Sequence, residues 1–426
     1  MANLKASKTL LRKQSDLSVI KIVRIIARLN VGGPARHVVW LTKALQDNRF
    51  QSVLIAGSVP EGEDDMSYFA FQNQVEPIFI PEMSRELSLK DFISLLKIYR
   101  ILLREKPDII HTHTAKAGTL GRVAGFFYRW FTPRTLIGKP RKVKMIHTYH
   151  GHIFHSYYGR LKTKFFLSIE KILALIATDK IIVISKQQFE EIHEKYKVGK
   201  SEQFAIIPLG IDLSPFVLSS SKRERFRSEF SVAPDEILIG IVGRLTEIKN
   251  HSLFLEVARL CKNRLQRSVK FIIIGDGHLR ESLERKAREL KVDDVTIFAG
   301  NRDDADCFYA GLDIVALTSL NEGTPLSLIE AMASSKPVIS TMVGGVRDLL
   351  GEIKSEENRF FICERGIGVK SGDSEGFYSG LQRLISDEVL RHKISKAGFD
   401  FVKQNYSKER LIADVRKLYE ELASRV

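Results

Sequence analysis

Short apolar runs alternate with longer amphipathic stretches along the whole chain. In the first half, runs rich in Val and Ile occupy residues 22–26, 52–56, 109–113, 144–149 and 180–184. In the second half, such runs occupy 237–242, 270–274, 296–298, 314–317 and 337–340. Nearly continuous, β-branched apolar runs are typical of parallel strands buried on both faces. The pattern therefore predicts parallel sheets with both faces covered.

Between these strands, apolar residues follow helical spacing at 35–46, 88–104, 187–196, 251–263, 278–290 and 325–334. Alternating strands and helices predict an α/β fold with two doubly wound units. Pro215 and three consecutive serines at 219–221 mark a linker, which gives domains at 1–215 and 216–404. The 426 residues, 44% of them hydrophobic, suffice for two domains of about 200 residues each. A final stretch, 407–424, is also strongly helical.

The most informative segment is 318–333, which runs TSLNEGTPLSLIEAMA. Thr324 suits the N-cap of a helix, and Pro325 suits its first position. The amides of Leu326 and Ser327 would then lie in the first turn without intrahelical partners. Because the helix dipole adds positive potential there, this turn could seat a phosphate or diphosphate.

Two carboxylates flank this helix start. Glu322 precedes it in a loop, and Glu330 lies about two turns inside the helix. Carboxylates are poor partners for phosphate but good acceptors from sugar hydroxyls. The pattern therefore suits a nucleotide sugar, although taken alone it also fits an ordinary capped helix with two solvated glutamates.

Together with its surroundings, the segment resembles the E-x7-E signature of retaining glycosyltransferases of family 4, which have the GT-B fold. Segments 30–37 (NVGGPARH), 207–212 (IPLGID), 240–250 (GIVGRLTEIKN) and 271–277 (FIIIGDG) are similar to other landmarks of that family. The resemblance implies two Rossmann-like domains facing a central cleft, with the acceptor in the first and the nucleotide sugar in the second. It also implies that a C-terminal helix, 405–426, packs back on the first domain.

The same resemblance assigns roles to individual residues. Arg244, Lys249 and the amides of the helix start would face the leaving diphosphate, so we expect neither a metal nor another cofactor. The candidate catalytic residues are His150, Arg244, Lys249 and Glu322. The candidate donor-binding residues are Gly33, Asn301, Arg302, Gly323, Thr324, Leu326, Ser327 and Glu330. The candidate acceptor-side residues are Gly32, His113 and Lys116. The loop 30–34 departs from the commoner family form, because Arg36 and His37 rather than an acidic residue follow it.

Six histidines fall in two clusters at strand ends: His111, His113, His147, His150, His152 and His155. A metal centre is one interpretation, but Asp108 is the only carboxylate close in sequence, and the surrounding Lys and Arg residues would repel a dication. His111 and His147 are better explained as core histidines. His150 lies in a T-x-H-G pattern that resembles the family's catalytic loop.

Charge is concentrated in the first half. Residues 1–215 hold 33 of the 66 Lys and Arg residues and 19 of the 51 Asp and Glu residues, so they carry +14 of the net +15. No acidic residue occurs from 109 to 169, where basic residues mix with aromatic ones such as 126–131 (FFYRWF). Such mixing is typical of contact with an anionic membrane surface. A basic acceptor cleft, an ordinary basic surface and, least favoured, nucleic acid are the alternatives.

The three cysteines are scattered and odd in number, which favours a reducing cytosol, and no apolar run has the length of a spanning helix. We therefore expect a cytoplasmic enzyme, peripheral on the inner face of the cell membrane. The resemblance implies a retaining hexosyltransferase that moves sugar from a UDP-sugar to a polyprenyl-diphosphate-linked saccharide in surface polysaccharide synthesis. A nucleotide-sugar epimerase on the same fold and a catalytically silent sugar-nucleotide-binding module are the alternatives.

Overall fold

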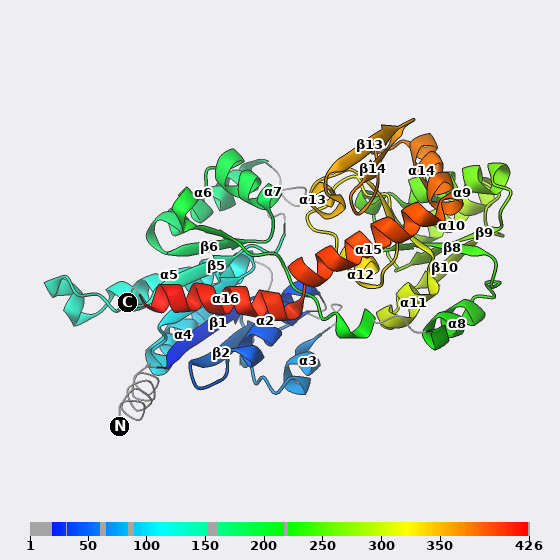
Figure 1. Ribbon diagram of the computed structural model, residues 1–426. Coiled ribbons are helices and arrows are strands. Elements are labelled where there is room, and N and C mark those ends of the chain that lie inside the picture. Colours follow the sequence, from blue (N-terminus) through cyan, green and yellow to red (C-terminus); the bar gives the residue numbers. More distant parts are fainter. Residues whose placement is uncertain are drawn as a thin grey trace, which may run out of the picture. The chain divides into compact units, whose positions relative to one another are not determined.

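The computed structural model describes residues 19–30, 32–59, 65–83, 89–151, 160–216 and 220–424. Contacts divide the chain into two compact units (Figure 1). The first comprises residues 1–209 together with 411–426, and the second comprises residues 210–410. Each unit contains its own sheet and its own apolar core.

The first unit is built on a seven-stranded sheet in the order β3-β2-β1-β4-β5-β6-β7. All of its strand pairs are parallel. The strands are β1 (Ile20–Ile26), β2 (Phe50–Gly57), β3 (Ile78–Ile80), β4 (Ile109–His113), β5 (Lys144–Thr148), β6 (Lys180–Val183) and β7 (Phe204–Ile206). The five strands predicted for this half are present, while the short edge strands β3 and β7 were missed because three residues carry too little apolar pattern.

Helices cover both faces of this sheet, because alternate side chains of each strand point to opposite faces. On one face, α4 (Lys90–Glu105), α5 (Ala115–Trp130) and α6 (Arg160–Ile176) pack on residues such as Val23, Ile25 and Met145. On the other, α2 (Gly33–Ala44) and the terminal helix α16 (Lys408–Ala423) pack on Ile22 and Ile146. Helix α16 buries Leu411, Val415, Leu418, Tyr419 and Leu422 there.

The remaining helices of the first unit are short. Helix α3 spans Ser67–Gln72, and 3-10 turns occupy Pro133–Ile137 (η1) and Ser201–Gln203 (η3). The amphipathic stretch predicted at 187–196 is not one α-helix. It forms a single α-turn, α7 (Lys186–Phe189), which continues as a π-helix, η2 (Glu190–Lys195). The spacing of apolar residues could not distinguish an α-helix from a π-helix here, because so short a segment fits both helical periods.

The second unit contains an eight-stranded sheet in the order β10-β9-β8-β11-β12-β15-β14-β13. Its strands are β8 (Ile237–Val242), β9 (Val269–Ile274), β10 (Thr296–Gly300), β11 (Ile314–Leu317), β12 (Val338–Thr341), β13 (Ile353–Glu357), β14 (Phe360–Cys363) and β15 (Gly366–Val369). The five predicted strands belong to the parallel part of this sheet, and β15, which was not predicted, adds a further parallel strand beside β12. The strands β13 and β14 add an antiparallel edge that the sequence pattern did not indicate.

The helices of this unit are α8 (Ser220–Glu229), α9 (His251–Arg264), α10 (Arg280–Glu289), α11 (Ala305–Gly311), α12 (Leu326–Ala333), α13 (Val346–Leu350), α14 (Ser374–Ser386) and α15 (Glu388–Asn405). Short 3-10 turns lie at Ser214–Phe216 (η4) and Glu247–Lys249 (η5). The chain passes from one unit to the other twice, near residue 210 and near residue 410, and these two segments are bonded to each other. The amide of Ile211 donates to the carbonyl of Tyr406, and Lys408 pairs with Asp212 at 2.9 Å.

Candidate functional site

The carboxyl edge of the second sheet carries most of the predicted donor residues, because parallel strands end at the same edge. Arg244 follows β8 and is exposed, and its side chain makes no hydrogen bond or ion pair with another described residue. Its loop is fixed from beneath: the amide of Leu245 donates to the carbonyl of Asp276 at 3.0 Å. Gly275 permits this contact, since a Cβ there would lie 2.1 Å from the carbonyl oxygen of Gly243.

Lys249 and Glu322 come together at this edge from different loops. The Nζ atom of Lys249 lies 2.5 Å from Oε1 of Glu322, and Oγ of Ser319 donates to the same oxygen at 2.6 Å. The two side chains are 23% and 11% exposed, so this ion pair is half-buried and still reachable. The sequence predicted both residues but not their direct contact.

Backbone hydrogen bonds lock the two loops together. Leu320 donates its amide to the carbonyl of Ile248 at 2.8 Å, and Thr318 Oγ1 bonds the carbonyls of Lys249 and Asn250. Such bonds fix the separation of Lys249 and Glu322 before any ligand arrives. Preorganised charges of this kind need no rearrangement during a reaction.

A third loop, after β12, supports Glu322 and was missed by the sequence reasoning. Gly345 donates its amide to the carbonyl of Glu322 at 3.1 Å. Gly344 has φ +51°, and a Cβ there would lie 1.9 Å from the Glu322 carbonyl oxygen. The pair Gly344-Gly345, which lies three residues after a buried strand, was the signal in the sequence for this close approach.

Helix α12 begins one residue later than predicted. Its first residue is Leu326, and Pro325 rather than Thr324 occupies the N-cap position, with no side-chain cap. The reason is that the carbonyl of Pro325 accepts the first helical bonds, from Leu328 and Ile329. The amides of Leu326 and Ser327 nevertheless lie in the first turn, where helical geometry provides no acceptor for them. Gly323 and Thr324 form the bend before it.

Glu330 lies on α12 and is held by a buried tyrosine. Tyr309 Oη lies 3.1 Å from Oε2 of Glu330 and 3.1 Å from the carbonyl oxygen of Ser327. Tyr309 is fully buried. Burial first, and then the charge of Glu330, raise the pKa of Tyr309 well above its usual range, so it stays a donor. Sequence reasoning did not identify Tyr309, because nothing in its local pattern links it to Glu330.

Arg302 occupies a different environment from the one predicted. Its guanidinium is paired with Glu229 at 2.5 Å and with Asp304 at 2.7 Å, and it lies over the rings of Phe226 and Phe230. Hydrogen bonds to Asp304 and Glu229 raise the pKa of Arg302 further. The side chain is therefore committed to holding α8 and α11. The neighbouring Asn301 is exposed, in the loop after β10.

In the first unit, three histidines converge at the carboxyl edge of the sheet. His113 ends β4, His150 follows β5, and His37 lies on α2. His113 Nδ1 lies 2.9 Å from His150 Nε2, and the ring of His37 lies 4.8 Å from that of His150, centroid to centroid. Burial lowers the pKa of His150 to about 4 and holds that of His113 well below its usual range, so both are neutral at pH 7.

The neighbouring histidines belong to the core, as expected. His111 is buried, with Nδ1 2.5 Å from Tyr419 Oη on α16 and Nε2 2.7 Å from Thr148 Oγ1. His147 is buried, and its Nδ1 lies 2.8 Å from Thr112 Oγ1. His152 and His155 lie outside the described residues.

The other two acceptor-side candidates are placed near the same edge. Gly32 is the N-cap residue of α2, and Gly33 is its first residue. Lys116 lies at the start of α5, where its Nζ pairs with Asp91 of α4 at 2.7 Å. The two side chains are only 8% and 15% exposed. The structure therefore gives Lys116 a role in joining two helices, and its charge is already matched.

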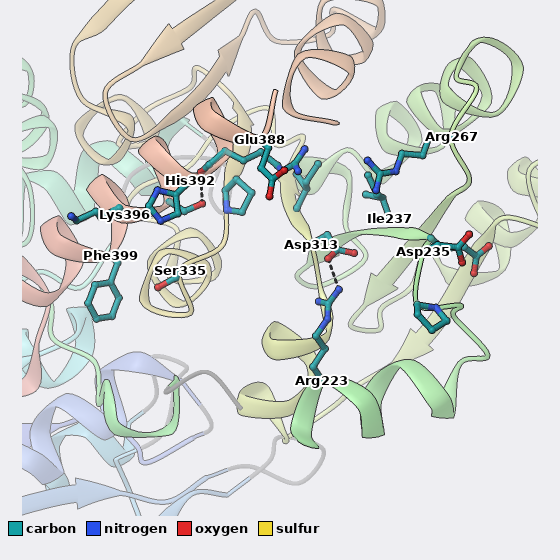
Figure 2. A pocket seen from close by; sticks show the side chains of 16 residues that line it. Arg223, Asp235, Ile237, Arg267, Asp313, Ser335, Glu388, His392, Lys396 and Phe399 are labelled. Carbon is teal, nitrogen blue, oxygen red and sulfur yellow. Dashed lines mark hydrogen bonds and ion pairs between the residues drawn. The ribbon is translucent and has the colours of Figure 1, made fainter. Parts of the chain in front are cut away.

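A pocket of about 630 Å³ lies elsewhere in the second unit (Figure 2). It is lined at the amino ends of β8, β11 and β12 by Ile237, Ile314 and Pro337, and on α15 by His392 and Lys396. None of the predicted donor residues lines it. It is therefore at the edge of the sheet opposite to Arg244 and Glu322.

Comparisons with known proteins agree on one family. A family model for glycosyl transferases group 1 matches residues 222–401, and one for glycosyltransferase family 4 matches residues 31–215. A UDP-Gal:α-D-GlcNAc-diphosphoundecaprenol α-1,3-galactosyltransferase of Escherichia coli is 29% identical over 404 residues, which are 92% of this chain and 96% of that protein. The capsular polysaccharide biosynthesis glycosyltransferase CapM of Staphylococcus aureus is 26% identical over 82% of this chain and 86% of its own length.

Solved structures agree on the fold. HepE of Anabaena, in complex with UDP, has a TM-score of 0.74 at 18% identity, covering 94% of this chain and 100% of that one. The lipopolysaccharide outer core galactosyltransferase WaaB has a TM-score of 0.65 at 17% identity, covering 94% and 100%. These likenesses show two α/β domains of the GT-B fold. In the described part of the chain, no helix has the length and apolar character needed to cross a bilayer.

Proposed function

Because the chain belongs to the group 1 and family 4 glycosyltransferases, we propose that it moves a hexosyl group from a UDP-sugar to a lipid-linked saccharide with retention of anomeric configuration. The observation that carries this proposal is the cluster at the carboxyl edge of the second sheet. There Arg244, whose side chain has no partner among the described residues, the Lys249–Glu322 pair and the first turn of α12 lie on loops that are hydrogen-bonded to one another.

The chemical reason lies in the leaving group. As the glycosidic bond breaks, negative charge grows on the diphosphate, and stabilising that charge is the largest demand on the site. Arg244 and Lys249 would supply two cations, and the amides of Leu326 and Ser327 would supply neutral donors at a positive helix end. Glu322 would accept from hydroxyls of the sugar, and Glu330 from those of the ribose.

Glu322 has a second role in this arrangement. In the free protein it matches the charge of Lys249. When a diphosphate arrives, Lys249 can share its proton donors between the carboxylate and the phosphate oxygens, because an ammonium has three donors. Glu322 would then orient Lys249 as well as contact the sugar.

In the first unit, His150 would face the donor sugar, and His113 would hold the ring of His150 through their hydrogen bond. We propose that this edge, with Gly32, receives the acceptor. The E. coli relative is named for an acceptor carried on diphosphoundecaprenol, which supports a lipid-linked acceptor here. The CapM relative supports a role in surface polysaccharide synthesis.

A membrane-facing surface is part of the same proposal. Helix α5 contacts both α4 and α6, and the outer side of this three-helix layer exposes many large apolar residues. They are Leu89, Phe92, Ile93, Leu96 and Leu103 of α4 and its start, Trp130 and Phe131 at the end of α5, Leu136 and Ile137 of η1, and Phe165, Ile172, Leu175 and Ile176 of α6. Leu136 is 91% exposed and Leu175 71%.

Exposed basic residues border this apolar layer, among them Arg134, Lys139, Lys164 and Lys171. A surface binds an anionic membrane when its rings and aliphatic side chains enter the headgroup region and its cations contact lipid phosphates. We propose that the enzyme is peripheral on the cytoplasmic side, where it would meet a lipid-linked acceptor.

Incubation of the purified protein with a panel of nucleoside-diphosphate sugars tests the proposal, with and without a lipid extract that contains the carrier. We expect UDP release that depends on the extract, with radiolabelled sugar entering the lipid phase. Conversion of one UDP-sugar into another without any acceptor would instead show an epimerase. Binding of UDP-sugar without release or conversion, with all extracts, would show a silent binding module.

A further inference from the structure

Three histidines form a cluster at the carboxyl edge of the first sheet. The proposed transfer reaction does not require a metal ion at this cluster. We propose that His37, His113 and His150 bind one divalent transition-metal ion of the zinc type, and that this ion inhibits the enzyme. The binding part stands on the geometry of the cluster alone. The inhibitory part rests on the function proposed above for His150.

The fold brings the three residues together from distant parts of the sequence. Strands β1, β4 and β5 are neighbours, with Ile26 paired to His113 and His113 paired to Thr148. Helix α2, which follows β1, carries His37, and the residue pair Tyr149-His150 directly follows β5. All three rings therefore lie at one sheet edge by the course of the backbone, not by a chance surface contact.

The nitrogen atoms are close enough for one ion. One ring nitrogen from each of the three residues lies within 4.8 Å of the others. In a tetrahedral zinc site the metal–nitrogen distance is about 2.0–2.1 Å, which places the ligand nitrogens roughly 3.4 Å apart. Binding of an ion would therefore draw the three rings closer together.

One ring nitrogen in the cluster lacks a hydrogen-bond partner in the described part of the chain. His113 is fully buried, and its Nε2 has no hydrogen-bond partner among the described residues. A buried polar atom without a partner is unfavourable unless something else satisfies it. By contrast, His111, whose ring lies 4.1 Å from that of His113, has both nitrogens bonded and is not a candidate ligand.

The ligand set selects the kind of ion. Three imidazoles without a carboxylate suit Zn²⁺, Co²⁺, Ni²⁺ or Cu²⁺, whereas Mg²⁺ and Ca²⁺ require oxygen ligands. Local positive charge opposes binding: the fully buried Arg24 bonds Tyr419 and Thr42 nearby and has no carboxylate partner in the described contacts. We therefore expect binding weaker than that of structural zinc sites, which suits reversible inhibition.

The expected inhibition follows from competition for one ring. Zinc held by His150 would remove the imidazole that the proposed mechanism directs at the donor sugar. An ion at this site would also place a dication where the acceptor hydroxyl must approach. Zinc should thus lower turnover without changing the nucleotide affinity of the second unit.

The first experiment measures binding by the full-length, tag-free protein after treatment with chelator. Titration with Co²⁺ is followed by its visible d–d absorption, and titration with Zn²⁺ by calorimetry. We expect one equivalent to bind. His37→Asn and His113→Asn should each weaken binding at least about tenfold. His392→Asn, at an exposed histidine of the second unit, is the matched control and should bind as the wild type does.

Two results would overturn the site. One is the absence of stoichiometric Zn²⁺ and Co²⁺ binding by the wild type. The other is binding that His37→Asn and His113→Asn both leave intact. X-ray absorption of the zinc-loaded wild type needs no variant to fold, and it should show three imidazole scatterers; a shell with sulfur or with oxygen alone would contradict the assignment.

The inhibitory role is tested separately by UDP release. Zinc should inhibit the wild type and the His392→Asn control, and this inhibition should be weakened in His37→Asn. If zinc binds at the histidines but release is unaffected, the inhibitory part is wrong and the site stands. If no sugar donor is ever turned over, the proposed function is wrong, and the binding result is unaffected.

Discussion

At the scale of single residues, the predicted donor-site cations of the second unit differ in whether a carboxylate already pairs with them. Arg244 is exposed and without a side-chain partner in the described structure, Lys249 is shared with Glu322, and Arg302 is saturated by two carboxylates. A cation that no carboxylate already neutralises attracts an incoming phosphate most strongly. Arg244 is therefore the residue whose removal should affect catalysis most cleanly.

Arg244→Ala should lower kcat/KM at least about 100-fold, because one preorganised contact to the developing charge is worth on the order of 3 kcal/mol. The melting temperature should not change, since the side chain bonds no described residue. Steady-state UDP release and thermal unfolding measure the two effects. Arg285→Ala, at an exposed arginine of α10, is the control. Near-normal turnover of the Arg244 variant would remove this residue from the donor site.

Tyr309→Phe tests the positioning of Glu330. The change removes one hydroxyl that bonds a carboxylate, an interaction worth about 1.5 kcal/mol, or roughly tenfold. If Glu330 holds the ribose in the ground state and in the transition state alike, KM for the donor should rise while kcat stays constant. A fall in kcat with unchanged KM would show that Tyr309 does not act through donor binding.

At the scale of elements, the proposed donor site depends on three loops that are bonded to one another after β8, β11 and β12. Each loop follows a buried parallel strand, so its origin is fixed, and the hydrogen bonds between loops fix its course. The Gly344 region is the least replaceable part, because the backbone there touches the carbonyl of Glu322.

Gly344→Ala should lower activity about 100-fold, since displacing the Glu322 loop by about 1 Å is enough for such a loss. Gly372→Ala is a matched control: φ is also positive, at +80°, but nothing lies within 4 Å of the added methyl group. The control should lose only about 1 kcal/mol of stability, from the strained backbone. Equal activity of the two variants would show that the close contact does not support the site.

At the scale of the whole molecule, some basic residues are buried or paired with carboxylates, and others are exposed to solvent. Several cations of the acid-free segment are internal: Arg122 is buried against Glu170, and Arg129 and Lys116 pair with Asp179 and Asp91. Those residues stabilise the first unit, and they are unsuitable for testing a surface. The exposed cations of η1 and its surroundings are the ones that a membrane can reach.

Arg134→Glu combined with Lys139→Glu should weaken binding to anionic vesicles by at least about 30-fold, because each basic residue contributes roughly 1 kcal/mol near such a surface. Vesicle co-sedimentation at physiological salt measures the effect. Lys403→Glu with Lys417→Glu changes the net charge equally at exposed sites on α15 and α16 and serves as the control. The membrane proposal fails if both double variants bind alike.

Turnover should persist in excess EDTA, because Arg244, Lys249 and the first turn of α12 are proposed to neutralise the leaving diphosphate. If zinc occupies the histidine cluster in the purified protein, EDTA should even raise the rate. Complete loss of UDP release, restored by Mg²⁺ or Mn²⁺, would contradict this mechanism. Those ions prefer oxygen ligands, so the histidine cluster could not explain such a result.

Much of the fold was predictable because its signals are local. The strands β4, β8 and β11 have the predicted bounds, since buried parallel strands are continuous apolar runs. The strands β3 and β7 and the hairpin β13–β14 were not predicted, because short or exposed strands leave a weak pattern. The buried strand β15 was not predicted either, because two of its four residues are glycines. The start of α12 was wrong by one residue, since a proline fits both the N-cap and the first helical position.

By itself, the sequence determined the α/β class, the resemblance to the family and which charged residues are candidates for the donor site, because these depend on runs and spacings within single segments. Only the tertiary structure decided which charges are available. Arg302 and Lys116 look the same in sequence as Arg244, yet Glu229, Asp304 and Asp91 reach them from other elements. Likewise, His37 joins His113 and His150 only because β1, β4 and β5 are neighbours. Such contacts join residues that are far apart in the chain, so the local sequence pattern cannot indicate them.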